Sequence, residues 1–360
     1  MSERASIFEK PRVGLENLST PGTPVAATLV LRSLTIAPTP MIPRNPIKAS
    51  GNMASVGMTG GKDHTEWSCD GPLTYTDSAF LFNSILGAPT SVTATGVTTL
   101  TWKPNAEAAN SLRTMTFEVG SGNGSSGFAG AFLTDLSISI DKNDAKISGK
   151  GMGKTYQEGI TLSTGTVDVV LEPVSSNQVS VFVGATLVSL DNPAARLKRC
   201  LSANFNMSGR QSILTTLDDT EQSYSASVER FFEKSAEIVI EQDSQGSALM
   251  GSLKRNDVIY VRYVCKGREI TTGLNYQLQI TFPAQIKSTS RQDSDDVYAG
   301  TYDLEPTYQT GFAGYVEVVL ATAAASATQA TATGVAPTGG TGVKSVETLT
   351  AYNTLPVAAS

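Results

Sequence analysis

Residues Gly127 to Lys154 read GFAGAFLTDLSISIDKNDAKISGKGMGK, and this stretch decides the fold class. Within it, Leu136, Ile138 and Ile140 alternate with polar residues, which is the period of a β-strand with one buried face. Residues 141–144 (DKND) are typical of a turn, and the alternation resumes after them. The stretch therefore predicts a β-hairpin.

A second stretch late in the chain repeats this pattern. Residues 276–282 (YQLQITF) alternate strictly and are followed by Pro283, where we expect the strand to end. Each stretch comes after a short helical pattern with capping residues at its start, the first over residues 76–86 and the second over residues 243–255. Because both halves run through strands, one short helix and strands again, we expect one β-rich unit that is duplicated within the chain.

Composition and charge narrow the class of protein. A chain of 360 residues can hold one large domain or two of ordinary size. Its 32 glycines favour β structure with frequent turns. The net charge of −6 argues against tight wrapping of nucleic acid, which needs a basic surface. The sequence has no apolar run of about 18 residues and no apolar N-terminal segment, so we expect neither a membrane span nor a secretory signal.

The order of these patterns predicts the domain organisation. Residues 1–47 are expected to form an extended N-terminal arm, because prolines crowd residues 38–46 and favour a polyproline-like run. A first β unit at 48–185 and a second at 186–320 follow. Residues 321–360 are rich in Ala, Thr and Gly, so we expect a low-complexity C-terminal tail without fixed structure.

The sequence gives little sign of catalysis. His64 is the single histidine and lies in a polar, glycine-rich segment with no nucleophile signature beside it. Cys69, Cys200 and Cys265 are far apart and form no CxxC pair, which favours reduced, buried thiols over a zinc site. We therefore expect no catalytic residue, no cofactor and no metal, and we do not expect an enzyme.

Several segments occur in an order that resembles one protein family. They are Val13–Glu16 (VGLE), Pro21–Ala27 (PGTPVAA), Cys69–Tyr75 (CDGPLTY), the helix that ends at Leu86-Gly87, Phe132–Ile140 (FLTDLSISI) and Ile147–Lys150 (ISGK). In this order they resemble the phage major tail proteins, the tail tube proteins of long-tailed, siphovirus-like phages. The resemblance covers roughly residues 12 to 320, and the low-complexity C-terminus departs from it.

The resemblance implies both a fold and a function. It implies a tail-tube-type β-sandwich or barrel with a short flanking helix. The function would be that of a structural virion protein, made in the host cytoplasm, that self-assembles into stacked rings. These rings would form the hollow tail tube that conducts the DNA genome during ejection. If each chain contains two units, three chains would form a ring with pseudo-sixfold symmetry. If the two halves form one unit instead, a ring of six chains is expected. The implied partners are further copies of the chain and the tail-tip, tape-measure and tail-terminator proteins, with DNA only as a non-sticking cargo and with no membrane.

Two sets of residues are candidates for roles in such a tube. An acidic lumen would repel DNA phosphates, and the candidates that line it are Asp141, Asp218, Asp219, Glu221, Glu229 and Glu233. Exposed loops and the proline-rich arm are expected to make contacts between rings, and the candidates there are Pro40, Pro43, Ser121, Gly124, Asp293 and Asp295.

Other classes of protein share parts of this pattern. The alternatives are another β-rich virion protein, such as a capsid or tail-terminator protein, and a surface-binding protein, such as a carbohydrate-binding β-sandwich. A carbohydrate-binding domain would need exposed aromatic platforms, and the aromatic content of 7% leaves that alternative open. A secreted adhesin usually has a signal peptide and disulfides, and the sequence shows neither.

Overall fold

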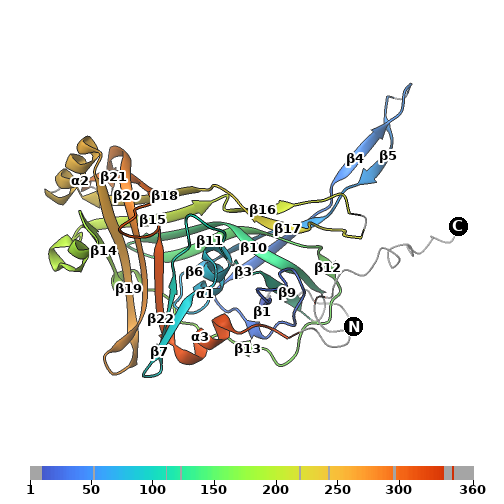
Figure 1. The fold of residues 1–360 in the computed structure, drawn as a ribbon, viewed down its shortest axis with the longest axis horizontal. Coiled ribbons are helices and arrows are strands. Elements are labelled where there is room, and N and C mark those ends of the chain that lie inside the picture. Colours follow the sequence, from blue (N-terminus) through green and yellow to red (C-terminus); the bar gives the residue numbers. More distant parts are fainter. Residues whose placement is uncertain are drawn as a thin grey trace.

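The computed structural model of the protein describes residues 10–335 and residue 343, apart from residues 52, 111, 122–123, 219, 242–243 and 295–296. The fold is mainly β, as the sequence predicts, and large sheets close into a barrel around one core (Figure 1). Helices are few and short.

The largest sheet, which we call the first sheet, contains the predicted hairpin as β10 and β11. Its strands, in order, are β3 (Thr35–Met41), β6 (His64–Pro72), β11 (Ala145–Gly153), β10 (Gly124–Asp141), β15 (Cys200–Ser208), β18 (Glu233–Glu241), β21 (Val297–Pro306) and β20 (Leu274–Ser294). All of these pairs are antiparallel. Buried and exposed residues alternate in β6, β11 and β15, so the sheet has one core face and one outward face.

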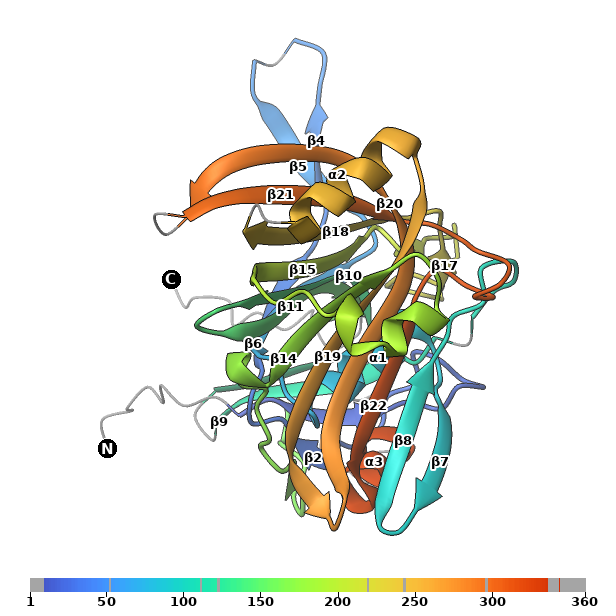
Figure 2. The same ribbon diagram turned by 90° about the vertical axis from the view of Figure 1, so that its left-hand side faces the viewer.

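A second sheet faces the first one across the core (Figure 2). Its strands, in order, are β14 (Val179–Gly184), β19 (Val258–Thr271), β20, β22 (Glu317–Ala323), β8 (Val97–Trp102) and β7 (Thr90–Ala94). A third sheet runs through β13 (Val167–Asp168), β2 (Leu29–Val30), β1 (Arg12–Leu15), β9 (Met115–Ser121), β10 and β12 (Gln157–Glu158). Separate hairpins are formed by β4 (Arg44–Lys48) with β5 (Ser55–Gly60) and by β16 (Gln211–Leu214) with β17 (Ala226–Glu229).

The long strands β10 and β20 each belong to two sheets. In β10, residues 124–131 pair with β9, whereas residues 132–141 pair with β11 and β15. In β20, residues 274–285 pair with β19 and residues 284–294 pair with β21. The predicted strand end at Pro283 is therefore wrong. Proline has no N–H to donate to a neighbouring strand. Pro283 is tolerated because, on one side of β20, the neighbour changes there from β22 to β21, so neither the β20–β22 ladder nor the β20–β21 ladder is interrupted.

The core between the first and second sheets is built on aromatic contacts. The rings of Phe205 and Phe282 lie 5.2 Å apart between centroids, and those of Tyr263 and Phe282 lie 5.5 Å apart. The buried hydroxyl of Tyr263 donates a hydrogen bond of 3.1 Å to the carbonyl of Asn204. This bond links β19 to β15, so the two sheets are joined by a polar contact as well as by apolar packing.

Helix α1 (Ser78–Leu86) is buried on every side and packs against β10 and β8. The sequence predicted a flanking helix, but SAFLFNSIL is apolar almost all round, and such a helix is stable only when it is enclosed. The buried amide of Asn83 is paired, because its Oδ1 accepts a hydrogen bond of 3.0 Å from the Trp102 indole. Asp77 is one of the residues at the start of the predicted helix that were expected to cap it, but its side chain makes no capping bond and accepts the backbone N–H of Ser33 at 2.9 Å instead.

Residues 321–335 have a defined structure, which corrects the predicted C-terminal tail. The end of β22 and helix α3 (Ala324–Thr331) form most of this segment. Alanine favours helices, and its small side chain allows close packing; Ala327 and Ala330 are buried. Arg113 holds the end of α3, because its guanidinium donates to the last carbonyl of the helix at 2.5 Å. The rest of the predicted tail, apart from one residue, lies outside the described residues.

Hydrogen bonds cross the domain boundaries that the sequence predicted. Residues 12–41 of the expected arm contain β1, β2 and β3, whose apolar residues Val13 and Ile36 are buried. Pro38 lies in β3 at the edge of the first sheet, where a missing N–H is tolerated. The pairs β10–β15, β14–β19 and β22–β8 join the chain on either side of the expected boundary at residues 185/186. The described chain forms one hydrogen-bonded body, and the duplication stays a prediction.

A buried carboxylate holds the third sheet to its connecting loops. The side chain of Glu16 accepts backbone N–H groups of Gly22 at 2.7 Å and of Gly130 at 2.8 Å. It also accepts the hydroxyls of Thr114 at 2.6 Å and Thr116 at 2.8 Å. Burial raises the pKa of Glu16 above its ordinary value of 4.5, although these hydrogen bonds oppose the shift. One side chain thus connects β1, β9 and the bend of β10.

We expect that Glu16→Ala destabilises the protein by about 3 kcal/mol or more, because it leaves several buried donors without an acceptor, each costing about 1–3 kcal/mol. The measurement is urea unfolding followed by tryptophan fluorescence. The wild-type chain should also lose stability as the pH rises from 4.5 through the raised pKa of Glu16, and the variant should lack this slope.

The matched control is Glu66→Ala, which removes an exposed carboxylate from β6. Its free energy of unfolding should stay within about 0.5 kcal/mol of the wild type. Equal losses for the two variants would show that Glu16 does not have the structural role described.

Candidate functional site

The outward face of the first sheet is a continuous polar surface, which we call the polar face. It consists of Glu66, Ser68 and Asp70 on β6, Lys146, Ser148 and Lys150 on β11, Asp135, Ser137, Ser139 and Asp141 on β10, Ser202, Asn204, Asn206 and Ser208 on β15, Glu233, Ser235 and Glu237 on β18, and Asp303 and Glu305 on β21. The strand register brings these side chains together in rows. In one row Asp70 lies opposite Ser148, Ser148 opposite Ser137, Ser137 opposite Asn206, and Asn206 opposite Ser235.

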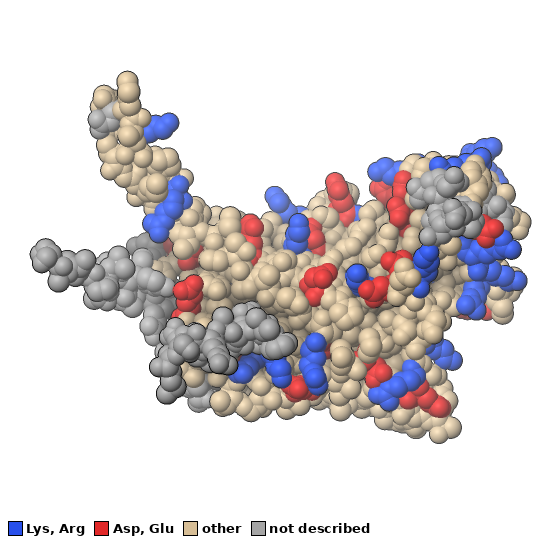
Figure 3. Space-filling view, turned by 180° about the vertical axis from the view of Figure 1, so that it is seen from behind, with Lys and Arg blue, Asp and Glu red and all other residues tan. Residues whose placement is uncertain are grey.

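Carboxylates outnumber lysines on the polar face, and hydrogen bonds keep some of them ionised. Burial alone would raise the pKa of Asp135, but hydrogen bonds from Ser208, from Thr134 and from the Gly209 N–H lower it. The backbone N–H groups at the β10–β11 turn lower the pKa of Asp141. Seen from behind, Asp and Glu side chains are spread over the middle of the molecule among Lys and Arg side chains, and further Lys and Arg gather at the end that carries helix α2 (Ser244–Arg255) (Figure 3). A polyanion that approaches the polar face at neutral pH therefore meets negative charge.

The structure places the predicted lumen residues in different environments. Asp141 and Glu233 belong to the polar face, but on β15 they lie opposite Ser202 and Ser208, which are about 20 Å apart along the strand. The remaining described candidates do not lie on this face. Asp218 and Glu221 are in the loop between β16 and β17, Glu229 is at the end of β17, and Asp219 lies outside the described residues.

Most acidic residues of the polar face were not predicted from the sequence. They are Glu66, Asp70, Asp135, Glu237, Asp303 and Glu305. Each sits at an alternate position of its strand, which is a signal that the sequence does contain. What the sequence does not contain is the order of the strands, so it could not show that residues 66 and 303 share one face.

The hairpin of β4 and β5 leaves the body of the molecule (Figures 1 and 3). Every residue of the two strands is exposed, and the strands pair only with each other. Ile47, Val56 and Met58 are 44%, 55% and 64% exposed. An isolated two-stranded hairpin is only marginally stable in water. The hairpin therefore presents apolar and backbone groups that a partner would stabilise.

The predicted inter-ring residues lie at separate edges of the fold. Pro40 and Pro43 are exposed at the base of this hairpin. Ser121 lies opposite Gly124 where β9 turns into β10. Asp293 lies opposite Tyr298 near the turn between β20 and β21, and Asp295 is not among the described residues. The structure does not bring these residues together into one surface.

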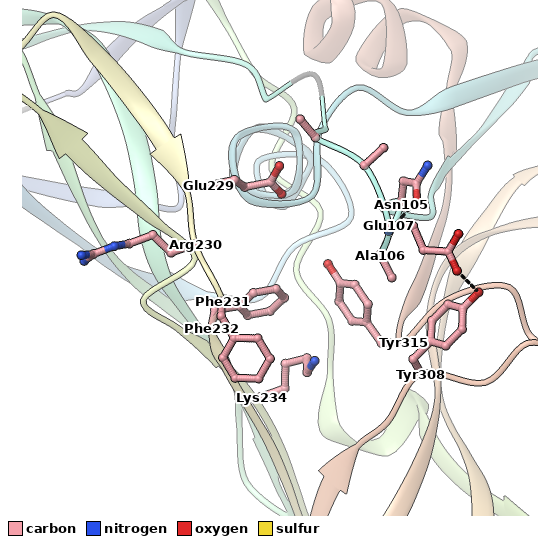
Figure 4. Close-up of a pocket in the computed structure, with 12 residues that line it drawn as sticks. Asn105, Ala106, Glu107, Glu229, Arg230, Phe231, Phe232, Lys234, Tyr308 and Tyr315 are labelled. Atoms are coloured by element: carbon pink, nitrogen blue, oxygen red, sulfur yellow. Dashed lines mark hydrogen bonds between the residues drawn. The ribbon is translucent and has the colours of Figure 1, made fainter.

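A pocket of about 630 Å³ lies between residues 105–109, the segment 229–234, and two tyrosines (Figure 4). The Nζ of Lys234 lies 4.9 Å from the ring centroid of Phe232 and 4.7 Å from that of Tyr315. Burial lowers the pKa of Lys234. Phe232 and Tyr315 thus already face the protein's own cation, whereas Phe231 and Tyr308 at the same pocket are 98% and 43% exposed.

Behind this pocket, Glu229 is paired with a buried arginine. Arg210 is fully buried, and its Nη2 lies 2.8 Å from the Glu229 carboxylate. Asn110 donates to the other oxygen of Glu229 at 2.9 Å through its backbone N–H. The carboxylate is thus used to neutralise Arg210 and to hold the β16–β17 hairpin to the body.

The side chains that could most readily support catalysis are His64 and the three cysteines. The Nε2 of His64 lies 3.9 Å from a carboxylate oxygen of Glu66. Burial raises the pKa of Cys69, Cys200 and Cys265 to about 12, far from the value of a reactive thiolate. Within the described part of the chain, no cluster of His, Cys, Asp and Glu has the arrangement of a metal site. No helix in that part is long and apolar enough to cross a membrane.

No family model and no curated protein matches the chain.

We expect the wild-type protein not to bind duplex DNA and a charge-reversed polar face to bind it. The variant carries Glu66→Lys, Asp70→Lys, Glu237→Lys and Asp303→Lys. It should bind with a dissociation constant of about 10⁻⁴–10⁻⁶ M and lose affinity as salt is raised. Fluorescence anisotropy with a labelled duplex measures both.

The control reverses four exposed acids outside the polar face, Glu107, Glu158, Asp168 and Glu269. Its total charge equals that of the test variant, but its charges are dispersed, so it should bind more weakly. If wild-type protein binds DNA as tightly as the test variant, the polar face is not the repulsive surface described.

Proposed function

We propose that the chain is the tail tube protein of a long-tailed phage, a structural virion protein that conducts DNA. The single observation that carries this proposal is the polar face: an acidic surface on a sheet whose other face is the core. Such a surface suits the lumen of a tube. It also supports a non-sticking role toward DNA, because phosphates and carboxylates repel each other.

Unpaired strand edges support assembly into rings. Among the described residues, β7 pairs only with β8 and β3 pairs only with β6. All residues of β7 are exposed, and it contains no proline, whereas β3 contains Pro38 and Pro40. An edge strand without a partner offers its free N–H and C=O groups to a strand of another chain, and proline in the edge strand blocks such pairing. We therefore assign the lateral contact between neighbouring copies to β7.

The β4–β5 hairpin supports contact beyond one ring. It extends past the body and exposes Ile47, Val56 and Met58, so its stability depends on a neighbour. When neighbouring copies are joined through two different surfaces and the repeated contact does not close into a ring, the assembly is open-ended. In the proposed tube the hairpin reaches a copy in the next ring, and the tail-tip, tape-measure and tail-terminator proteins set the ends and the length.

The decisive experiment is negative-stain electron microscopy of the purified protein, with the subunit mass from light scattering. We expect uniform hollow tubes or rings, and their symmetry distinguishes rings of three chains from rings of six. Particles that remain monomeric even after the addition of tail-tip proteins would contradict the proposal. They would favour another β-rich virion protein or a surface-binding domain.

The hairpin itself can be tested with Ile47→Ser, Val56→Ser and Met58→Ser combined. We expect the thermal stability of the monomer to change little, because the replaced side chains are exposed, while tubes are lost or shortened. The control combines Val167→Ser, Val170→Ser and Leu171→Ser, which are 54%, 50% and 45% exposed elsewhere on the surface. Normal tubes from the hairpin variant would remove the hairpin from the assembly contact.

A further inference from the structure

The pocket in Figure 4 has two aromatic rings that no part of the proposed tube uses. Its volume of about 630 Å³ lies within the range of sites for small ligands. Phe231 stands on the wall formed by residues 229–234, and Tyr308 stands on the opposite wall (Figure 4). Phe231 is almost fully exposed and Tyr308 is also exposed. Aromatic surface on both sides of the pocket is therefore accessible to a ligand.

Contacts within the chain hold the walls of this pocket in place. The rings of Phe232 and Tyr315 pack edge to face, with their centroids 5.4 Å apart. The side-chain amide of Asn110 donates to Glu229 at 2.9 Å and to the carbonyl of Asn105 at 3.0 Å. These bonds fasten one wall to the other. A site whose walls are already ordered loses little conformational entropy when a ligand binds.

One donor group and one acceptor atom at the pocket have hydrogen-bonding capacity to spare. The ammonium of Lys234 lies over aromatic rings, and no hydrogen bond or ion pair within the described chain involves it. Glu107 accepts the hydroxyl of Tyr308 at 3.2 Å through its Oε1. Its Oε2 has no hydrogen bond to the described residues. A lysine ammonium only donates and a carboxylate only accepts, so a ligand has to supply both an acceptor and a donor.

This combination selects a neutral ligand with hydroxyl groups. A lone carboxylate or phosphate would be attracted to Lys234 but repelled by Glu107, and a cation would experience the reverse. A hydroxyl group both donates and accepts, so neighbouring hydroxyls of one molecule can satisfy both side chains. The C–H groups on the flat face of a sugar ring are weakly positive, and the face of an aromatic ring is negative. A neutral saccharide thus provides every group that the pocket leaves without a partner.

We propose that this pocket binds a neutral saccharide, with a sugar ring stacked on Phe231 or Tyr308 and with its hydroxyls bonded to Lys234 and Glu107. The inference goes beyond the proposed function, because conducting DNA requires no sugar site. The pocket is also separate from β7 and from the β4–β5 hairpin, the two surfaces assigned to assembly. Saccharide binding and tube formation can therefore be measured independently.

The test measures binding of maltohexaose, cellohexaose and N-acetylchitohexaose to the purified full chain by isothermal titration calorimetry. At least one of these neutral probes should bind with a dissociation constant of about 1 mM or below. Phe231→Ala and Tyr308→Ala should each weaken this binding by about two- to tenfold, because each removes a stacking surface. Lys234→Met keeps the length of the side chain but removes its donors, and it should weaken binding by about tenfold.

A second readout reports on the site directly. Burial lowers the pKa of Lys234, so a larger share of its amine is uncharged and able to react with an N-hydroxysuccinimide ester of acetate. Peptide mass mapping should show that the bound probe protects Lys234 from this acetylation. Exposed lysines outside the pocket, such as Lys266, should react equally with and without the probe.

The matched control is Tyr298→Ala, which removes an exposed tyrosine that does not line the pocket. It should bind the probes like the wild type, and all three aromatic variants should keep the wild-type thermal stability. The inference is overturned if no neutral probe binds, if Phe231→Ala and Tyr308→Ala bind as well as the wild type, or if only an acidic probe, trigalacturonate, binds. Each of these results leaves the proposed function standing. Loss of tubes in Phe231→Ala together with no saccharide binding by the wild type would make this ring an assembly contact instead.

Discussion

The shared strands β10 and β20 are the constraint on which the rest of the structure depends. Each begins in one sheet and ends in another, so the sheets cannot move independently. In β10 the change occurs at a register shift between Phe128 and Ala131, where Gly130 has φ +65°. A side chain at Gly130 would be strained, and its Cβ would lie 2.7 Å from the Tyr224 hydroxyl. The bend therefore needs glycine, and Glu16 holds it from the other side.

The same alternation produces both the core and the polar face. In β15, Phe205 and Met207 point into the core, while Asn204, Asn206 and Ser208 point outward. Because the side-chain period of a strand is two, a slip of one residue would bury the polar set and expose the apolar one. The burial of the core thus fixes the register of the polar face. The arrangement of its charges follows from packing that takes place on the opposite side of the sheet.

Local features of the sequence predicted local structure well. The β10–β11 hairpin, α1 and α2 occur where the alternation and the helical patterns place them. Helix α3 was missed because its stability comes from distant groups: Arg113 binds its last turn, and Asn83 donates to the carbonyl of Ala330 at 2.6 Å. The pairing of Glu229 was missed for a similar reason, since its partner Arg210 lies beside it only once β16 and β17 pair. Strand order, which joins residues 66 and 303 on one face, cannot be obtained from the pattern of any single segment.

The proposed assembly would need contacts that favour growth of a tube over random pairing of chains. In that proposal each contact surface is weak when taken alone, because β7 is only five residues long and the strands of the β4–β5 hairpin pair only with each other. A single such contact barely offsets the entropy lost on association. A copy that joined an existing ring would engage its β7 edge and its hairpin together, so the second contact would form at high effective concentration. Growth on a preformed end is then favoured over spontaneous pairing, which is the behaviour a tube of defined length requires.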